Sequence, residues 1–268
     1  MRIGGVPIGG GAPLVLISGL NVLETSDAAV ACAEALRALA ERHALPLVFK
    51  ASFDKANRTH GDAYRGPGID AGLEMLARVK RETGLPLMTD VHEPSQAAPA
   101  AEVVDCLQIP AFLVRQTDLI AACATTGRSL NLKRGQFIAP SEMRYAVEKA
   151  LALGATEVLV SERGSSFGFN DLVVDMRGLV TLAEFAPVCF DATHAAQRPG
   201  AAEGASGGDR RMVAPLARAA VATGIDALFV EAHPNPDEAP CDAACQLGFD
   251  ALEALVAEVC AIRAALVG

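Results

Sequence analysis

Short apolar runs alternate with helix-forming segments along the whole chain, and this alternation constrains the fold more than any other feature. Each run is almost continuously apolar, as expected of parallel strands that are covered by helices on both faces. Most runs end in a polar or glycine-rich stretch that leads into a helical pattern. The eight runs span residues 14–19, 45–52, 85–90, 103–110, 129–135, 157–164, 187–194 and 227–233.

The segments between the runs carry helix signals. Ser26 is the expected N-cap of a helix over 27–43, and Thr-Gly or Leu-Gly pairs end several of the others. The remaining clear helices are expected over 70–82, 141–153, 211–223 and 248–267. Eight strand–helix alternations without a linker or a shift in composition predict one closed (β/α)8 TIM barrel, with residues 1–268 as a single domain.

Two further segments bear on the architecture. An open doubly wound sheet is disfavoured because the first run is followed by LNVL at 20–23, not by a glycine-rich phosphate fingerprint. Residues 1–10 hold two glycine clusters around Val6, Pro7 and Ile8, and they predict a short hairpin over the bottom of the barrel.

Composition and charge exclude several classes of function. The net charge of −9 argues against a nucleic-acid binder or a membrane-surface protein, because both need a positive face. No run of about 18 uncharged apolar residues suggests a membrane span, and the N-terminal residues lack the pattern of a signal peptide. The seven cysteines form no zinc-type pairing and are expected to be buried thiols. Together these features predict a cytoplasmic protein.

Polar side chains follow nearly every apolar run, where a barrel would gather them around its active site. The cations among them would repel one another in one cavity, so a multiply charged anion bearing phosphate or carboxylate is the expected occupant. The candidate residues are Lys50, Lys55, Asn57, Arg58, Asp90, Gln108, Arg115, Lys133, Arg163, Asp191, His194 and Glu231.

Two features stay open on residue types alone. His194, Glu231 and the downstream Asp242 are suitable ligands for a divalent ion, yet three such residues leave a metal site undecided. The segment 197–209, rich in glycine, alanine and proline, fits a mobile lid over a ligand and an ordinary crossover loop equally well.

Several motifs resemble one enzyme family, 3-deoxy-D-manno-octulosonate 8-phosphate synthase. The resemblance covers about residues 14 to 245, and the combination of motifs is highly specific. The related 3-deoxy-D-arabino-heptulosonate 7-phosphate synthase usually has KPR where this chain has KANR. The motifs are KANR at 55–58, RGPG at 65–68, TDVHEP at 89–94, QIPAFL at 108–113, RQTD at 115–118, FGFN at 167–170, FDATH at 190–194 and EAHP at 231–234.

The resemblance implies a reaction and a role for each residue. The family condenses phosphoenolpyruvate with D-arabinose 5-phosphate, for lipopolysaccharide biosynthesis, and releases phosphate. Lys55 would polarise the sugar aldehyde, and His194, Asp242 and Glu231 would orient or activate water. Arg115 would cross a subunit boundary in a homotetramer, and Thr59 stands where the family more often has Ser. Phosphoenolpyruvate would be held by Lys50, Lys55, Gln108, Lys133, Arg163 and His194, and the sugar phosphate by Asn57, Arg58, Thr59 and Asp90.

Asn21 decides the cofactor within this resemblance. The metal-dependent branch of the family has Cys at this position together with His, Glu and Asp, whereas the metal-independent branch has Asn. His194, Glu231 and Asp242 match the other three positions, so the chain is expected to carry a vestigial site and no cofactor. Against this, SERGSSFGFND at 161–171 and the DATH motif look more like the metal-dependent branch.

Three alternatives remain. The first is the seven-carbon synthase, which uses erythrose 4-phosphate. The second is a Schiff-base aldolase in which Lys133 attacks a carbonyl, helped by neighbouring cations that would depress its pKa. The third is a non-catalytic sugar-phosphate-binding barrel, which would be expected to lose its cations, whereas here every charged position is filled.

Overall fold

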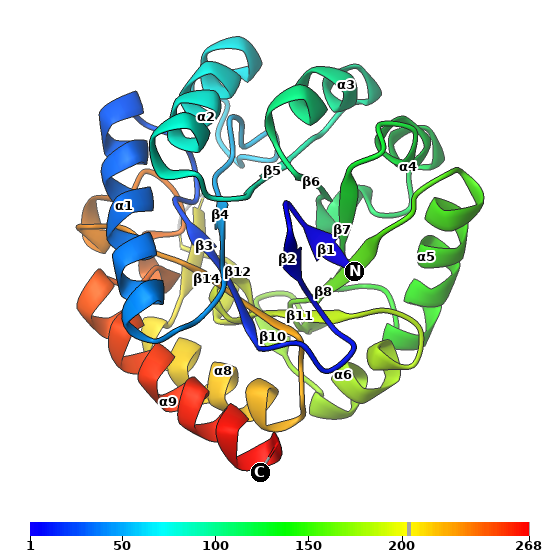
Figure 1. The fold of residues 1–268 in the computed structure, drawn as a ribbon, viewed down its shortest axis with the longest axis vertical. Helices are drawn as coiled ribbons and strands as arrows, with labels where there is room; N and C mark the ends of the chain where they lie inside the picture. Colours follow the sequence, from blue (N-terminus) through cyan, green and yellow to red (C-terminus); the bar gives the residue numbers. More distant parts are fainter. Residues whose placement is uncertain (203–204, 268) are drawn as a thin grey trace.

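Eight parallel strands close into a barrel in chain order, as the apolar runs predicted (Figure 1). The computed structural model describes residues 1–202 and 205–267. The last strand returns to the first, and Ala227 to Glu231 pair with Val15 to Gly19. The strands are β3 (Val15–Gly19), β4 (Leu47–Lys50), β5 (Leu87–Asp90), β6 (Cys106–Ile109), β7 (Ser129–Lys133), β8 (Val158–Glu162), β11 (Val188–Asp191) and β14 (Ala227–Glu231).

The long helices form a ring outside the barrel (Figure 1). Their apolar faces and the outward faces of the strands form the larger hydrophobic core. Two predicted helices, 141–153 and 211–223, each begin with a 3-10 turn. The helices are α1 (Ser26–Arg42), α2 (Ile69–Thr83), α3 (Pro94–Val103), α4 (Thr117–Ala124), α5 (Met143–Ala152), α6 (Met176–Ala183), α8 (Val213–Ala222) and α9 (Phe249–Val267), and a single turn, α7 (Ala192–Ala195), follows β11.

The predicted N-cap of α1 was wrong by one residue. Thr25 has extended backbone angles and its side chain accepts the amide of Ala28 at 3.2 Å, so Thr25 is the N-cap. Ser26 is already helical, and its hydroxyl instead accepts a hydrogen bond from the Arg78 guanidinium at 3.1 Å. The contact with α2 therefore uses the side chain that sequence reasoning assigned to the cap.

The predicted N-terminal hairpin is confirmed, and it closes the bottom of the barrel. Strands β1 (Arg2–Ile3) and β2 (Val6–Pro7) pair antiparallel and cross the barrel axis in Figure 1. Ile3 and Ile8 are fully buried and pack against side chains inside the barrel, which include Val15, Met88, Leu159 and Phe229. The N-terminal end of the barrel is thereby filled with apolar side chains.

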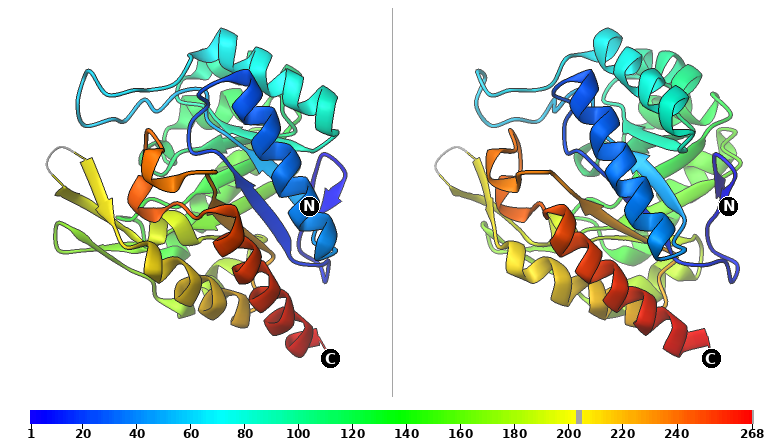
Figure 2. Two further views of the ribbon diagram at one scale, coloured as in Figure 1. Left: turned by 90° about the vertical axis from the view of Figure 1, so that its left-hand side faces the viewer. Right: turned by 60° about the vertical axis from the view of Figure 1, so that its left-hand side comes forward.

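Longer connections extend from the opposite, C-terminal end of the barrel (Figure 2). One is the antiparallel hairpin of β9 (Ser165–Phe167) and β10 (Asp171–Val173). The other lies in the segment predicted as a lid or crossover loop, where β12 (Gln197–Ala202) pairs with β13 (Ala205–Gly208). The tip of that segment, 203–204, lies outside the described residues. The sequence did not predict this hairpin, since its glycines and alanines give no strand signal.

Two sequence-level expectations also concern the whole molecule. None of the helices in the two described ranges is long and apolar enough to cross a membrane. All seven cysteines lie within those ranges; they are free thiols, and six of them are buried. The expectation that they are small buried side chains is confirmed for six of them, whereas Cys260 on α9 is partly exposed.

Candidate active site

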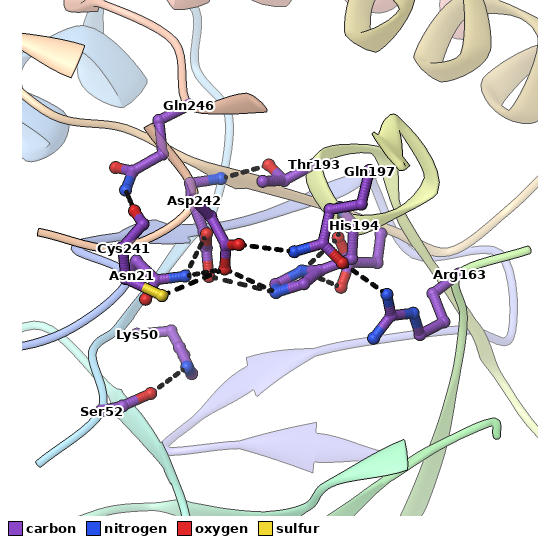
Figure 3. Close-up of polar contacts among 12 residues, drawn as sticks. Asn21, Lys50, Ser52, Arg163, Thr193, His194, Gln197, Cys241, Asp242 and Gln246 are labelled. Atoms are coloured by element: carbon purple, nitrogen blue, oxygen red, sulfur yellow. Dashed lines mark hydrogen bonds and ion pairs between the residues drawn. The ribbon is translucent and has the colours of Figure 1, made fainter. Parts of the chain in front are cut away.

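The strand ends bring most of the predicted site residues together at the C-terminal mouth of the barrel. Figure 3 shows part of this site, with Asn21, Lys50, Arg163, His194 and Asp242 labelled. Side chains two residues apart on a strand face the same side, so pairs such as Lys50 and Ser52 point into the same space. The members that are less than one-tenth exposed are Asn21, Lys50, Lys55, Asp90, Gln108, Lys133, Arg163, Asp191, His194 and Glu231.

The first cluster joins two lysines through one hydroxyl. The Nζ atoms of Lys50 and Lys55 donate to Ser52 Oγ at 2.6 and 2.8 Å, and Ser52 donates to Asp90. Asp90 Oδ1 also lies 3.2 Å from Lys50 Nζ, and its other oxygen faces His92 Nε2 at 3.2 Å. One carboxylate therefore partly neutralises two buried cations, and the remaining charge favours an anionic ligand.

Burial and the neighbouring charges shift the pKa of each ionisable group in this cluster in opposite directions. Burial lowers the pKa of Lys50 to about 8, and the attraction of Asp90 only partly offsets this effect. For Lys55 burial also disfavours the charge, but attraction to Asp90 and Glu231 outweighs it and raises the pKa. The Asp90 pKa lies well below its usual value, because Lys50 and Lys55 outweigh the effect of burial.

The second cluster is a buried triad from β7, β11 and the single turn α7. Lys133 Nζ lies 2.5 Å from Asp191 Oδ2 and 3.2 Å from His194 Nδ1. The ammonium lies 5.1 Å from the centre of the Phe229 ring, an arrangement typical of cation–π contacts. Burial would raise the pKa of Asp191, but His194 and Lys133 lower it further than burial raises it. Asp191 thus orients His194, whose Nε2 points away from the triad.

The third cluster contains the three potential metal ligands. One ligand atom each from His194, Glu231 and Asp242 lies within 4.8 Å of the others. His194 Nε2 is 3.8 Å from a carboxylate oxygen of each acid. The Asp242 pKa is lowered, because His194 and Lys55 together outweigh burial. Both acids face one imidazole.

Asn21 occupies the fourth position of this cluster. Its Nδ2 donates to Glu231 Oε2 at 2.7 Å and to Asp242 Oδ2 at 2.9 Å. Both acceptors are carboxylate oxygens, so the amide must present its nitrogen, and an amide nitrogen has no free lone pair for a metal. A neutral donor thus lies between the two acids, and the donor set does not fit a tightly held divalent ion.

The predicted sugar-phosphate residues lie in the connection between β4 and α2. Asn57 and Thr59 are exposed, whereas Arg58 is partly buried and donates to the carbonyl of Pro240 at 3.3 Å. That contact brings the connection to the segment that carries Asp242. Arg115 is exposed and lies elsewhere, in a surface cavity of about 170 Å³ lined also by Ile138, Tyr145 and Lys149.

Sequence reasoning missed several polar residues of the mouth. Ser52 could have been found from the two-residue spacing to Lys50, and the same spacing relates Asn131 to Lys133. The Asn131 amide donates to Gln108 Oε1 at 3.1 Å and so orients a predicted site residue. Gln197 had no such local signal, because its neighbours in sequence form a glycine-rich hairpin.

A buried ion pair was also missed. Arg134 follows the site cation Lys133, and Glu162 precedes the site cation Arg163. The Arg134 guanidinium donates two hydrogen bonds of 2.5 Å to the Glu162 carboxylate. The guanidinium also donates to the carbonyls of Gly135 and Ile138 and to Ser165. This pair fixes the loop after β7 against the start of β9, at the edge of the mouth.

A closed parallel barrel with buried lysines, an arginine and carboxylates at the C-terminal ends of its strands defines an enzyme for small anionic substrates. Residues 2–265 match the DAHP synthetase I family, and the chain belongs to that family. It is similar to proteins named 2-dehydro-3-deoxyphosphooctonate aldolase. The relative from Pseudoalteromonas translucida is 50% identical over 262 residues, which cover 98% of this chain and 92% of the relative. That from Magnetococcus marinus is 55% identical over 238 residues, covering 88% and 83%.

Proposed function

We propose that the chain condenses phosphoenolpyruvate with D-arabinose 5-phosphate and water, forming 3-deoxy-D-manno-octulosonate 8-phosphate and phosphate. It is then a transferase of lipopolysaccharide biosynthesis that works as a single barrel domain in the cytoplasm. The observation that carries this proposal is the set of buried cations at the barrel mouth. The chain is also 50% identical to a relative named 2-dehydro-3-deoxyphosphooctonate aldolase. The proposed substrates bring two phosphates and a carboxylate, which match this charge.

Phosphoenolpyruvate is assigned to the inner half of the mouth. Lys50, Lys133 and Arg163 are buried there; Lys50 and Lys133 each pair with one acid, and Arg163 is bonded to the neutral Gln197, so a multiply charged anion would offset the cost of burying these cations. Gln108, oriented by Asn131, and His194 complete the set. Holding two anionic substrates close together against their repulsion is the main work that these cations do.

The sugar phosphate is assigned to the outer half. Asn57, Arg58 and Thr59 lie on the connection after β4, which reaches the Asp242 segment through Arg58. Asp90 would accept a hydrogen bond from a sugar hydroxyl. Lys55, whose pKa is raised by the surrounding acids, stays protonated and is positioned to polarise the aldehyde.

The chemical steps follow from these positions. Carbon 3 of the enol attacks the aldehyde carbon, and carbon 2 develops cationic character that water quenches. The tetrahedral adduct then loses phosphate by cleavage of a C–O bond. The carboxyl groups of Asp242 and Glu231 lie beside His194, and Asp242, whose pKa is lowered, can take a proton from that water.

We propose that this chemistry needs no metal cofactor. Asn21 Nδ2 lies 2.7 and 2.9 Å from the two carboxylates and supplies the hydrogen bonds that hold them apart. Its role is to orient Glu231 and Asp242 for the water. The set Asn21, His194, Glu231 and Asp242 is then a vestigial metal site that works as a water-activating cluster.

A homotetramer is part of the proposal. Phe112, Phe137 and Tyr145 are 52%, 62% and 69% exposed, and Tyr145 borders the cavity that also holds Arg115. Large exposed aromatic side chains of this kind favour contact with another subunit. A second copy on this surface would bury them and could direct Arg115 into a neighbouring sugar-phosphate site.

Phosphate release tests the function directly. The purified chain is incubated with phosphoenolpyruvate and either arabinose 5-phosphate or erythrose 4-phosphate, with and without a chelator. Release with the five-carbon sugar and no loss in chelator is expected. The second candidate, the seven-carbon synthase, is kept because the matched family is described as DAHP synthetase I. Release with erythrose 4-phosphate alone would establish that candidate instead.

A further inference from the structure

Gln197 lies between the cationic and the acidic halves of the site. It is the first residue of β12, and its side chain is buried although the rest of the hairpin extends outward. Figure 3 shows its amide between Arg163 on one side and Asp242 on the other. No strand of the barrel contributes this residue.

Both the oxygen and the nitrogen of the Gln197 side-chain amide form hydrogen bonds. Arg163 Nη2 donates to Gln197 Oε1 at 2.6 Å, and Gln197 Nε2 donates to Asp242 Oδ1 at 2.7 Å. The polarity is fixed, because a guanidinium can only donate and a carboxylate can only accept. The neutral Gln197 amide thus binds the Arg163 cation on one side and the Asp242 carboxylate on the other.

The distance between Arg163 and Asp242 matters because a direct ion pair with this carboxylate would stabilise the buried guanidinium. Among the described residues the Arg163 guanidinium has no ion pair; its Nη2 donates to Gln197, and its buried Nε has no hydrogen-bond partner. Burial lowers its pKa, although Asp191 and Asp242 act in the opposite direction. A buried cation gains most by meeting a carboxylate, and that contact would cancel the charge needed for an anionic ligand.

We propose that Gln197 is a positioning residue that keeps Arg163 from pairing with Asp242. The amide gives each charge one hydrogen bond and leaves both available, Arg163 for the phosphoenolpyruvate phosphate and Asp242 for water. This inference rests on the proposed function, because it assigns Arg163 to that substrate. It also explains why a buried polar residue enters the site from a hairpin in which Arg198, Gly200 and Ala201 are exposed.

The test is a double-mutant cycle on phosphoenolpyruvate affinity, measured by titration calorimetry without the sugar phosphate. Gln197→Met keeps the length of the side chain and removes both bonds, so Arg163 turns to Asp242 and the Kd rises about tenfold, the value of one hydrogen bond to a charged group. In the Asp242→Asn background the competing carboxylate is gone. The same Gln197→Met change should then raise the Kd less than about twofold.

Gln197→Glu gives an independent prediction. Its carboxylate pairs with Arg163 directly, so affinity falls about tenfold in both backgrounds and Asp242→Asn does not restore it. Arg198→Gln, the next position on β12, is the matched control. Arg198 is exposed and pairs with Asp171 at 3.0 Å, so its loss disturbs the hairpin and leaves the Kd unchanged.

The outcomes separate the two proposals. A wild-type chain that fails to bind phosphoenolpyruvate contradicts the proposed function. A wild-type chain that binds it, with equal losses from Gln197→Met in both backgrounds, contradicts the spacer role of Gln197 alone. If circular dichroism shows that Gln197→Met is unfolded, the Kd of Gln197→Glu in the wild-type and Asp242→Asn backgrounds decides instead. A Gln197→Glu change that no longer weakens phosphoenolpyruvate binding in the Asp242→Asn background overturns the proposal.

Discussion

Replacing Asn21 with alanine removes the donor that lies between two buried carboxylates. Asn21→Ala takes away hydrogen bonds of 2.7 Å to Glu231 and 2.9 Å to Asp242. The Gln197 amide still donates to Asp242, and His194 Nε2 stays 3.8 Å from each acid. The two acids then face a space as large as the lost amide. The expected results are a lower free energy of unfolding and a new affinity for divalent cations.

The size of the first effect follows from the two bonds. A hydrogen bond to a charged group contributes about 1.5 to 3 kcal/mol, and its removal leaves a buried acceptor unsatisfied. Water can enter at the open mouth of the barrel and replace part of the loss. We therefore take the lower value for each bond and expect Asn21→Ala to lower the free energy of unfolding by about 3 kcal/mol in the presence of a chelator.

Urea unfolding with chelator and with Mn²⁺ measures both effects. Mn²⁺ at about one hundred times its Kd should raise the free energy of unfolding of Asn21→Ala by about 2.7 kcal/mol, because it binds the folded state. It should leave the free energy of unfolding of the wild type unchanged. The matched control is Asn131→Ala, another buried asparagine, whose partners Gln108 and Ser161 are uncharged. It should lose about 1 kcal/mol and gain nothing from Mn²⁺. Equal stabilisation of the wild type by Mn²⁺ would refute the metal-free proposal, and an unchanged stability of Asn21→Ala in chelator would refute the bridging role.

Three further predictions follow from the geometry. The pKa of Lys50 is lowered to about 8, and only its charged form attracts an anion, so phosphoenolpyruvate affinity should fall as the pH rises above that value. Calorimetry should show this decline in the wild type and none in Lys50→Gln, and a flat wild-type profile would contradict it. Lys133 is held in an ion pair of 2.5 Å with Asp191, so borohydride with a keto-acid substrate should leave no mass adduct on Lys133, whereas an adduct would support the Schiff-base alternative. Tyr145→Asp puts a charge on the exposed aromatic surface and should shift the mass by light scattering from tetramer toward smaller species, while the exposed position Val180→Asp on α6 should not.

The fold could be predicted almost completely from the sequence, because its signals are local. Each of the eight apolar runs became a barrel strand, and the strands are shorter than the runs at one or both ends. The hairpin β1–β2 was also expected, from its glycines. The hairpin β12–β13 was not, because its pairing depends on backbone contacts and its side chains carry no alternating pattern.

The chemistry of the site was divided between sequence and structure. Residue types and strand-end positions by themselves determined that cations, acids and His194 would gather at one mouth, since parallel strands all deliver their carboxyl ends to the same side. Which charges meet was decided by the tertiary structure alone. Asp191 faces Lys133, Asn21 bridges two acids, and Gln197 stands between Arg163 and Asp242. Such contacts join residues up to 221 positions apart along the chain, and their energies depend on distances of a few ångströms that no local pattern encodes.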